Sequence, residues 1–214
     1  MLSLMVTIVE VVGFLASLFV FFQPKSPLYL KLFPFFLLLT IIVEAIGDYL
    51  GKKNISNFAL YNFFSAFEFV FYFFVLSRII VHPKARKVTS TLTWIYPIIA
   101  AVNILFIQKI NNFHTITYSL GSLGIVSVSI YYFYELFQMQ HSVSLGREPA
   151  FWIVTGLLFF YTCAFPLLGF VNFISGAPKF IERNLAAILS VMNVFLYLMF
   201  TIAFLCRINI RKST

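Results

Sequence analysis

The chain has 214 residues, of which 61% are hydrophobic and only 10% are charged, and its mean hydropathy is +0.96. Soluble domains carry roughly 25% charged and 45–50% apolar residues, so this composition excludes a soluble globular protein and a disordered chain. The formal net charge of +8 does not indicate a nucleic-acid partner, because the basic residues lie between apolar segments, where membrane topology requires them. The sequence therefore predicts an integral membrane protein whose first partner is the lipid bilayer.

Seven apolar segments are long enough to cross a bilayer, which takes about 20 residues per helix. Short polar breakers rich in Pro, Gly, Asn and Lys separate them, as turns between helices should. The predicted spans are 2–22, 28–50, 56–80, 89–108, 113–139, 150–175 and 181–206. We therefore expect one all-α domain over residues 1–214, a polytopic bundle of seven transmembrane helices. The first segment has no basic residue before it, so we expect a permanent anchor rather than a cleaved signal peptide.

Orientation follows from the distribution of Lys and Arg. Ten of the fifteen fall at one membrane face and five at the other, and the richer face should be cytoplasmic. The N-terminus is then outside and the C-terminus cytoplasmic, and we expect a multi-pass protein of a bacterial inner membrane. The strongest inside signal is a predicted basic loop with Lys84, Arg86 and Lys87, which are candidate partner-facing residues. These cations could equally serve only topology and anionic lipid.

Acidic residues are the unusual feature of the predicted spans. Five of the seven in the chain lie inside spans and beyond their first turn, and Lys31, near the start of the second span, is the one lysine within any span: Glu10, Glu44, Asp48, Glu68 and Glu135. An ionisable group at the bilayer centre costs about 2.5–3.5 kcal/mol on insertion scales, so these acids need an explanation.

Helical spacing places four of these acids on polar stripes, because residues three and four apart share a helix face. The stripes contain Thr7, Glu10 and Ser17 in the first span, Thr40, Glu44, Gly47 and Asp48 in the second, Tyr61, Ser65, Glu68 and Tyr72 in the third, and Arg183, Ser190, Asn193, Tyr197 and Thr201 in the seventh. Such stripes should face the bundle interior rather than lipid.

The predicted topology assigns a depth to each acid. Glu10, Glu44 and Asp48 fall in the outer half and Glu68 lies near the midplane, so we expect an outer acidic cavity that narrows towards Glu68 and Asn193. This requires the first, second, third and seventh helices to be neighbours. The candidate ligand- or ion-binding residues are Glu68, Glu10, Glu44, Asp48, Asn193, Tyr197, Tyr61 and Tyr72. Glu68 is the leading one, because it is deepest.

Three interpretations of the acids stay open. A protonated Glu can donate a hydrogen bond between helices as structural glue. A carboxyl near the midplane can also relay protons or ions, and a group of acids can recognise a cationic or polar ligand from outside. No P-loop, G-x-S-x-G or H-E-x-x-H motif is present. We therefore predict no catalytic residue, no metal site and no cofactor.

Three functional hypotheses follow. The leading one is a small receptor- or sensor-like subunit that binds a ligand in the outer cavity and acts through another membrane or cytoplasmic signalling protein. The alternative is a small proton- or cation-coupled transporter that uses Glu68 and Glu10. A membrane-embedded lipid enzyme is third, because the chain offers no recognisable nucleophile and base.

The apolar residues support packing more than a ligand site. The 29 Phe side chains are best explained as lipid-facing filler, with interfacial Tyr and Trp belts. Gly121 and Gly124 fall on one helix face and predict a close helix–helix contact. Cys163 and Cys206 both lie in apolar segments and should be free thiols.

Overall fold

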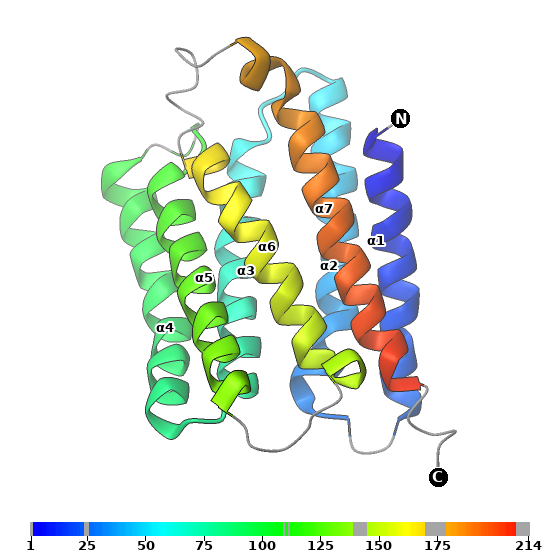
Figure 1. Cartoon of the computed structure of the whole chain (residues 1–214). Helices are drawn as coiled ribbons and strands as arrows, with labels where there is room; N and C mark the ends of the chain where they lie inside the picture. The colour runs from blue at the N-terminus through cyan, green and yellow to red at the C-terminus, as the bar shows by residue number, and fades with distance from the viewer. Residues whose placement is uncertain are drawn as a thin grey trace.

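A computed structural model of the chain describes residues 2–23, 26–108, 110, 112–138, 145–169 and 179–208. Within these ranges the structure is helical and contains seven helices long and apolar enough to cross a membrane (Figure 1). They are α1 (Leu2–Leu18, continued by the 3₁₀ turn η1, Phe19–Phe22), α2 (Leu28–Lys52), α3 (Phe58–Ile79), α4 (Pro83–Val102, continued by the π-helical turn η2, Asn103–Ile107), α5 (Thr115–Gln138), α6 (Pro149–Gly169) and α7 (Lys179–Ile208). A short 3₁₀ turn, η3 (Leu145–Arg147), precedes α6.

The predicted all-α class and the seven spans are confirmed, with one clear error of boundary. The fourth helix begins at Pro83, six residues before the predicted start at 89. Proline suits the first helical position because its φ angle is already helical and its missing N–H is not needed there. The basic residues that follow were predicted to form a loop because they are hydrophilic, although Lys and Arg are good helix formers. Residue 139 and residues 170–175 of two predicted spans lie outside the described residues.

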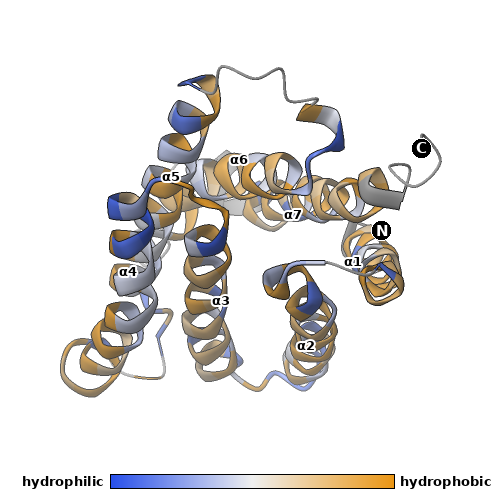
Figure 2. Cartoon of the chain, turned by 90° about the horizontal axis from the view of Figure 1, so that it is seen from below, coloured by the Kyte–Doolittle hydropathy of each residue, from blue (hydrophilic) through white to orange (hydrophobic). Residues whose placement is uncertain are grey.

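The helices form a bundle in which α3 is surrounded on several sides. Helix α1 packs against α2 and α7, α2 packs against α3, and α3 packs against α4 and α5. The chain of contacts continues from α5 to α6 and from α6 to α7 (Figure 2). The expected grouping is confirmed in part: α1, α2 and α7 pack together through α1, whereas α3 packs against α2 and meets α7 through the rings of Tyr72 and Phe200, whose centroids lie 6.3 Å apart.

Successive helices alternate in direction, so each end of the bundle collects particular segments. The start of α1, the end of α2 and the start of α7 lie at the upper end in Figure 1, and the start of α4 lies at the lower end. Which end faces the cytoplasm stays a prediction from the charge count.

The centre of the bundle is filled by aromatic rings. Phe36 and Phe71 stack at 4.2 Å with an interplanar angle of 6°, and Phe33 meets Phe71 and Phe200 edge-on at 5.1 and 5.3 Å. Other phenylalanines point outward, as expected of lipid-facing side chains, and Figure 2 shows mostly hydrophobic helices. Aromatic residues therefore serve both as core and as membrane surface.

Close approach between α3 and α5 depends on small residues, as predicted. A Cβ atom at Gly121 would lie 2.7 Å from the ring of Phe69, and one at Gly124 would lie 2.7 Å from the ring of Phe73. Both rings are almost fully buried, so the two glycines make the room that these aromatic side chains occupy.

Glu135 has a structural position at the lower end. Its carboxylate accepts hydrogen bonds from the backbone N–H groups of Val81 and His82, at 3.0 and 2.8 Å. These are the residues directly before α4, whose N-terminal N–H groups carry partial positive charge and favour a nearby anion. Glu135 on α5 thus fixes the start of α4.

Candidate functional site

A cavity of about 500 Å³ lies between α1, α2 and α7 at the upper end of the bundle. Three of the four acids on the predicted stripes line it, together with Asn193 and Ser190. The complete lining is Val6, Thr7, Glu10, Ile41, Glu44, Ala45, Asp48, Tyr49, Lys52, Leu189, Ser190 and Asn193. We call this space the acid cavity.

The three carboxyls of the acid cavity differ in depth. Glu10 is only 3% exposed, Glu44 is half-buried and Asp48 is exposed. Glu44 and Asp48 are four residues apart on α2, which places them on one helix face, and Glu10 faces them from α1. Lys52, one further turn along α2, is the one basic side chain among the lining residues. The acid cavity is therefore strongly anionic when its carboxyls are ionised.

Glu44 is held in place from α3. The Tyr61 hydroxyl donates a hydrogen bond to Glu44 Oε2 at 3.3 Å, and Asn57 Nδ2 donates to the Gly47 carbonyl at 3.4 Å. Gly47 allows this arrangement, because a Cβ atom there would lie 2.7 Å from Cζ of Tyr61. The predicted Tyr61 thus acts on the acid cavity through Glu44 rather than as a lining residue.

Tyr197 supports Glu10 from α7 in a similar way. It is buried, and its hydroxyl lies close to the Glu10 carboxyl. The backbone of this part of α7 approaches α1 closely, since a Cβ atom at Gly13 would lie 3.3 Å from Thr201 Oγ1 and 3.7 Å from the Tyr197 carbonyl oxygen. The seventh-helix stripe therefore faces α1, except that the side chain of Arg183 lies outside the described residues.

Glu68 does not line the acid cavity. It lies at the middle of α3, near the hydroxyls of Tyr72 and Tyr161. Both hydroxyls are buried, and within the described residues neither meets the distance and angle of a hydrogen bond. The predicted residues therefore divide into an upper group around Glu10 and Glu44 and a deeper group around Glu68 and Tyr72. Tyr161 was missed because its segment of α6 has no polar stripe around it.

The predicted partner-facing residues lie at the opposite end of the molecule. Lys84, Arg86 and Lys87 occupy the first turns of α4, and all three are exposed. Arg86 Nε donates a hydrogen bond to the Ile80 carbonyl at 2.9 Å. Arg86 and Lys87, but not Lys84, line a cleft of about 350 Å³ along α4.

Sequence reasoning also missed Asn62, which joins α3 to the segment before α5. Its Nδ2 donates to the Asn112 carbonyl at 2.8 Å, and its Oδ1 accepts from the His114 backbone N–H at 2.9 Å. A single Asn in an apolar helix carries no sequence signal for such a distant partner. Because both its amide nitrogen and its amide oxygen bond to backbone groups of the segment before α5, Asn62 has a structural role.

The chemistry available in the acid cavity is that of carboxyls and neutral polar groups. No group of three or more His, Cys, Asp or Glu side chains within the described residues is arranged to hold a metal ion. Separated carboxyls with an amide and hydroxyls nearby can bind a positively charged group while donating to its polar atoms. Comparison with known proteins gives no match, whether with protein-family models, with curated proteins or with solved structures.

Proposed function

We propose that the protein is a receptor-like membrane subunit that binds a small organic cation, such as an amine, in the acid cavity. The observation that carries this proposal is the convergence of Glu10, Glu44 and Asp48 on one cavity of about 500 Å³ that has one lysine in its lining. Small-molecule sites usually have volumes of about 300–1,000 Å³ and a few well-placed polar groups, which this cavity matches.

An organic cation fits this cavity better than a bare metal ion. The carboxyls of the acid cavity come from two helices at different depths, and within the described residues they form no metal-binding group. An ammonium group has three donors and can bond to separated acceptors, while apolar lining residues such as Ile41 and Leu189 can contact carbon atoms.

Binding is favoured over transport by what lies beneath the acid cavity. Closer to the lower end of α2, the buried rings of Phe33, Phe36 and Phe200 pack against one another between α2 and α7. A ligand that enters from the upper end meets this packed aromatic core. The output would then pass through a protein partner at the lower, basic end, where Lys84 is the candidate contact because it lies outside the α4 cleft.

Thermal unfolding of the purified chain in mild detergent tests the proposal, with a panel of amines and inorganic cations. A ligand that binds only the folded state raises its apparent stability. We expect an amine to raise the Tm of wild type and of Glu68→Gln, and to have little effect on Glu44→Gln or Glu10→Gln. Glu68→Gln is the matched control, because it removes an intramembrane carboxyl that does not line the acid cavity. Equal shifts in all four proteins would contradict the proposal.

A second candidate is a proton- or cation-coupled transporter, which the deeper group favours. The buried hydroxyls of Tyr72 and Tyr161 near Glu68 provide sites through which a proton could pass between carboxyls and water. This candidate predicts flux in proteoliposomes that Glu68→Gln removes. Retained flux in Glu68→Gln, or stabilisation by an amine without any flux, would favour the receptor-like function.

A further inference from the structure

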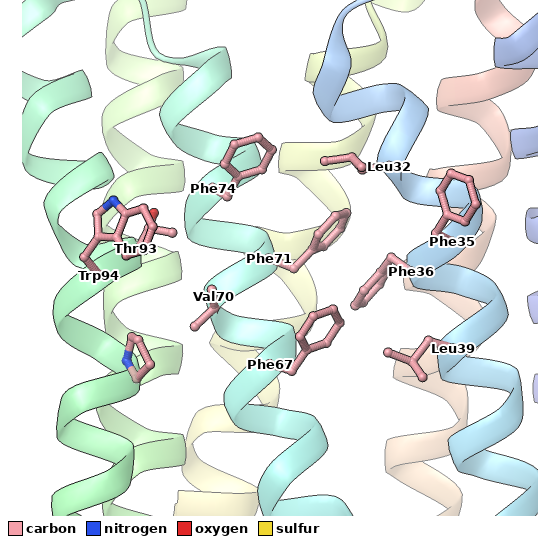
Figure 3. Close-up of a pocket in the computed structure, with 11 residues that line it drawn as sticks. Leu32, Phe35, Phe36, Leu39, Phe67, Val70, Phe71, Phe74, Thr93 and Trp94 are labelled. Atoms are coloured by element: carbon pink, nitrogen blue, oxygen red, sulfur yellow. The ribbon is translucent and has the colours of Figure 1, made fainter.

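A second, apolar cavity of about 610 Å³ opens on the membrane-facing side of the bundle and shares no lining residue with the acid cavity. Helix α3 forms its floor, and α2 and α4 form its sides (Figure 3). Its lining residues are Leu32, Phe35, Phe36, Leu39, Phe67, Val70, Phe71, Phe74, Thr93, Trp94 and Pro97. We call this space the apolar groove. Its lining is almost wholly carbon, which suits a hydrocarbon chain and no polar ligand.

The apolar groove continues into the basic cleft on α4. Trp94 lines both spaces, and the cleft extends from it to Lys87, Arg86 and Pro83 at the lower end of the bundle. Ser90 and Thr91 add hydroxyls to the cleft. One continuous surface thus passes from cations and hydroxyls near the end of the helix to aromatic and aliphatic side chains deeper along it.

The dimensions of this surface match one leaflet of a bilayer. Lys87 and Pro97 are ten residues apart on α4, which corresponds to about 15 Å of helix. That length is half of the roughly 30 Å hydrocarbon thickness of a typical membrane. A lipid with its phosphate at Lys87 therefore has room for an acyl chain in the apolar groove as far as the midplane.

We propose that the apolar groove and the α4 cleft together bind one anionic phospholipid. Its phosphate contacts Lys87 and the guanidinium of Arg86, whose Nε remains bonded to Ile80, and one acyl chain lies over Phe67 and Phe71. A zwitterionic lipid fits the groove equally well but adds a positive charge beside the two cations. Charge is therefore what selects the occupant, and this proposal is independent of ligand binding in the acid cavity.

Quenching of Trp94 by brominated acyl chains tests the proposal directly, because Trp94 is 75% exposed and lies where cleft and groove meet. The second tryptophan, Trp152, is replaced by Phe so that only Trp94 reports. The full chain is placed in phosphatidylcholine vesicles that contain either brominated phosphatidylglycerol or brominated phosphatidylcholine at equal mole fraction. We expect the anionic lipid to quench Trp94 beyond its mole fraction. Lys87→Gln should lower this preference about fivefold, as expected for one cation near an anionic surface.

Three further variants distinguish a specific lipid site from general electrostatic attraction. Lys84→Gln removes the same charge from the same helix but outside the cleft, so the preference should be largely retained. Val70→Phe fills the groove floor and should reduce quenching by both brominated lipids, whereas Val191→Phe on the exposed face of α7 should not. Equal quenching by the two lipids in wild type would overturn the proposal. If Lys84→Gln and Lys87→Gln lowered the lipid preference equally, the attraction would come from the overall surface charge rather than from a specific site. This result would overturn the proposal as well.

Discussion

Gly47 governs the contact between α2 and α3 beside the acid cavity. A methyl group at this position would overlap the end of the Tyr61 ring, so Gly47→Ala should push the ring aside and break the Tyr61–Glu44 hydrogen bond. We expect amine stabilisation to fall by similar amounts in Gly47→Ala and Tyr61→Phe, since each loses the same bond. Because a typical hydrogen bond to a charged group contributes about 1.5–3 kcal/mol, the loss of this bond is large enough to reduce the amine-induced shift in Tm measurably.

The double variant Gly47→Ala/Tyr61→Phe sharpens this prediction. Because both changes act through one bond, their effects on the amine-induced shift in Tm should not add. Gly51→Ala is the control, as it lies one turn further along α2 and a Cβ atom there meets nothing within 4 Å. Its shift should equal that of wild type. Additive losses in the double variant would show that Gly47 and Tyr61 act on the acid cavity separately.

The start of helix α4 depends on a residue that is distant in the sequence. Its start is fixed by the Glu135 carboxylate, which accepts two backbone N–H groups from the preceding turn. Glu135→Ala leaves both donors without this partner and should lower the free energy of unfolding by about 1–3 kcal/mol. The measurement is unfolding in mixed detergent micelles. Glu148→Ala, an exposed carboxyl directly before α6, is the control and should lose only the roughly 0.3–1 kcal/mol of an exposed acid near a helix N-terminus. A loss of similar size in Glu148→Ala would contradict the assigned role of Glu135.

Helix α4 and Glu135 also show where sequence reasoning succeeds in this chain and where it stops. Apolar length alone predicts seven spans, because a bilayer tolerates only helices with satisfied backbone groups. Hydropathy cannot place the start of α4, since its first turns are basic and lie at the membrane boundary. It also leaves Glu135 unexplained, because the partners are backbone groups more than 50 residues away in the chain.

The acid cavity illustrates the same limit for the candidate site. Helical spacing predicts that Glu10, Glu44 and Asn193 face inward, and the packing of α1, α2 and α7 brings them together. Spacing within α3 does not show how this helix is rotated relative to α1, α2 and α7. Glu68 was therefore expected to line the same cavity as the other acids. In the structure it lies near Tyr161 of α6 instead. Side-chain periodicity identifies the inner face of a helix, and only tertiary packing decides which inner faces share a space.

At the scale of the whole molecule, both proposals depend on the orientation of the bundle. If the end richer in Lys and Arg is cytoplasmic, the acid cavity opens to the outside and the α4 cleft lies in the cytoplasmic leaflet.

Single cysteines test this orientation in a background with Cys163→Ala and Cys206→Ala. Ser56→Cys, in the exposed segment between α2 and α3, should react in whole cells with a membrane-impermeant maleimide. His82→Cys, at the exposed turn before α4, should react only after the membrane is permeabilised. His82 is chosen because its replacement leaves every lysine and arginine of that end in place. The reverse labelling pattern would show that the acid cavity opens to the cytoplasm. The ligand would then be an intracellular cation rather than an external one.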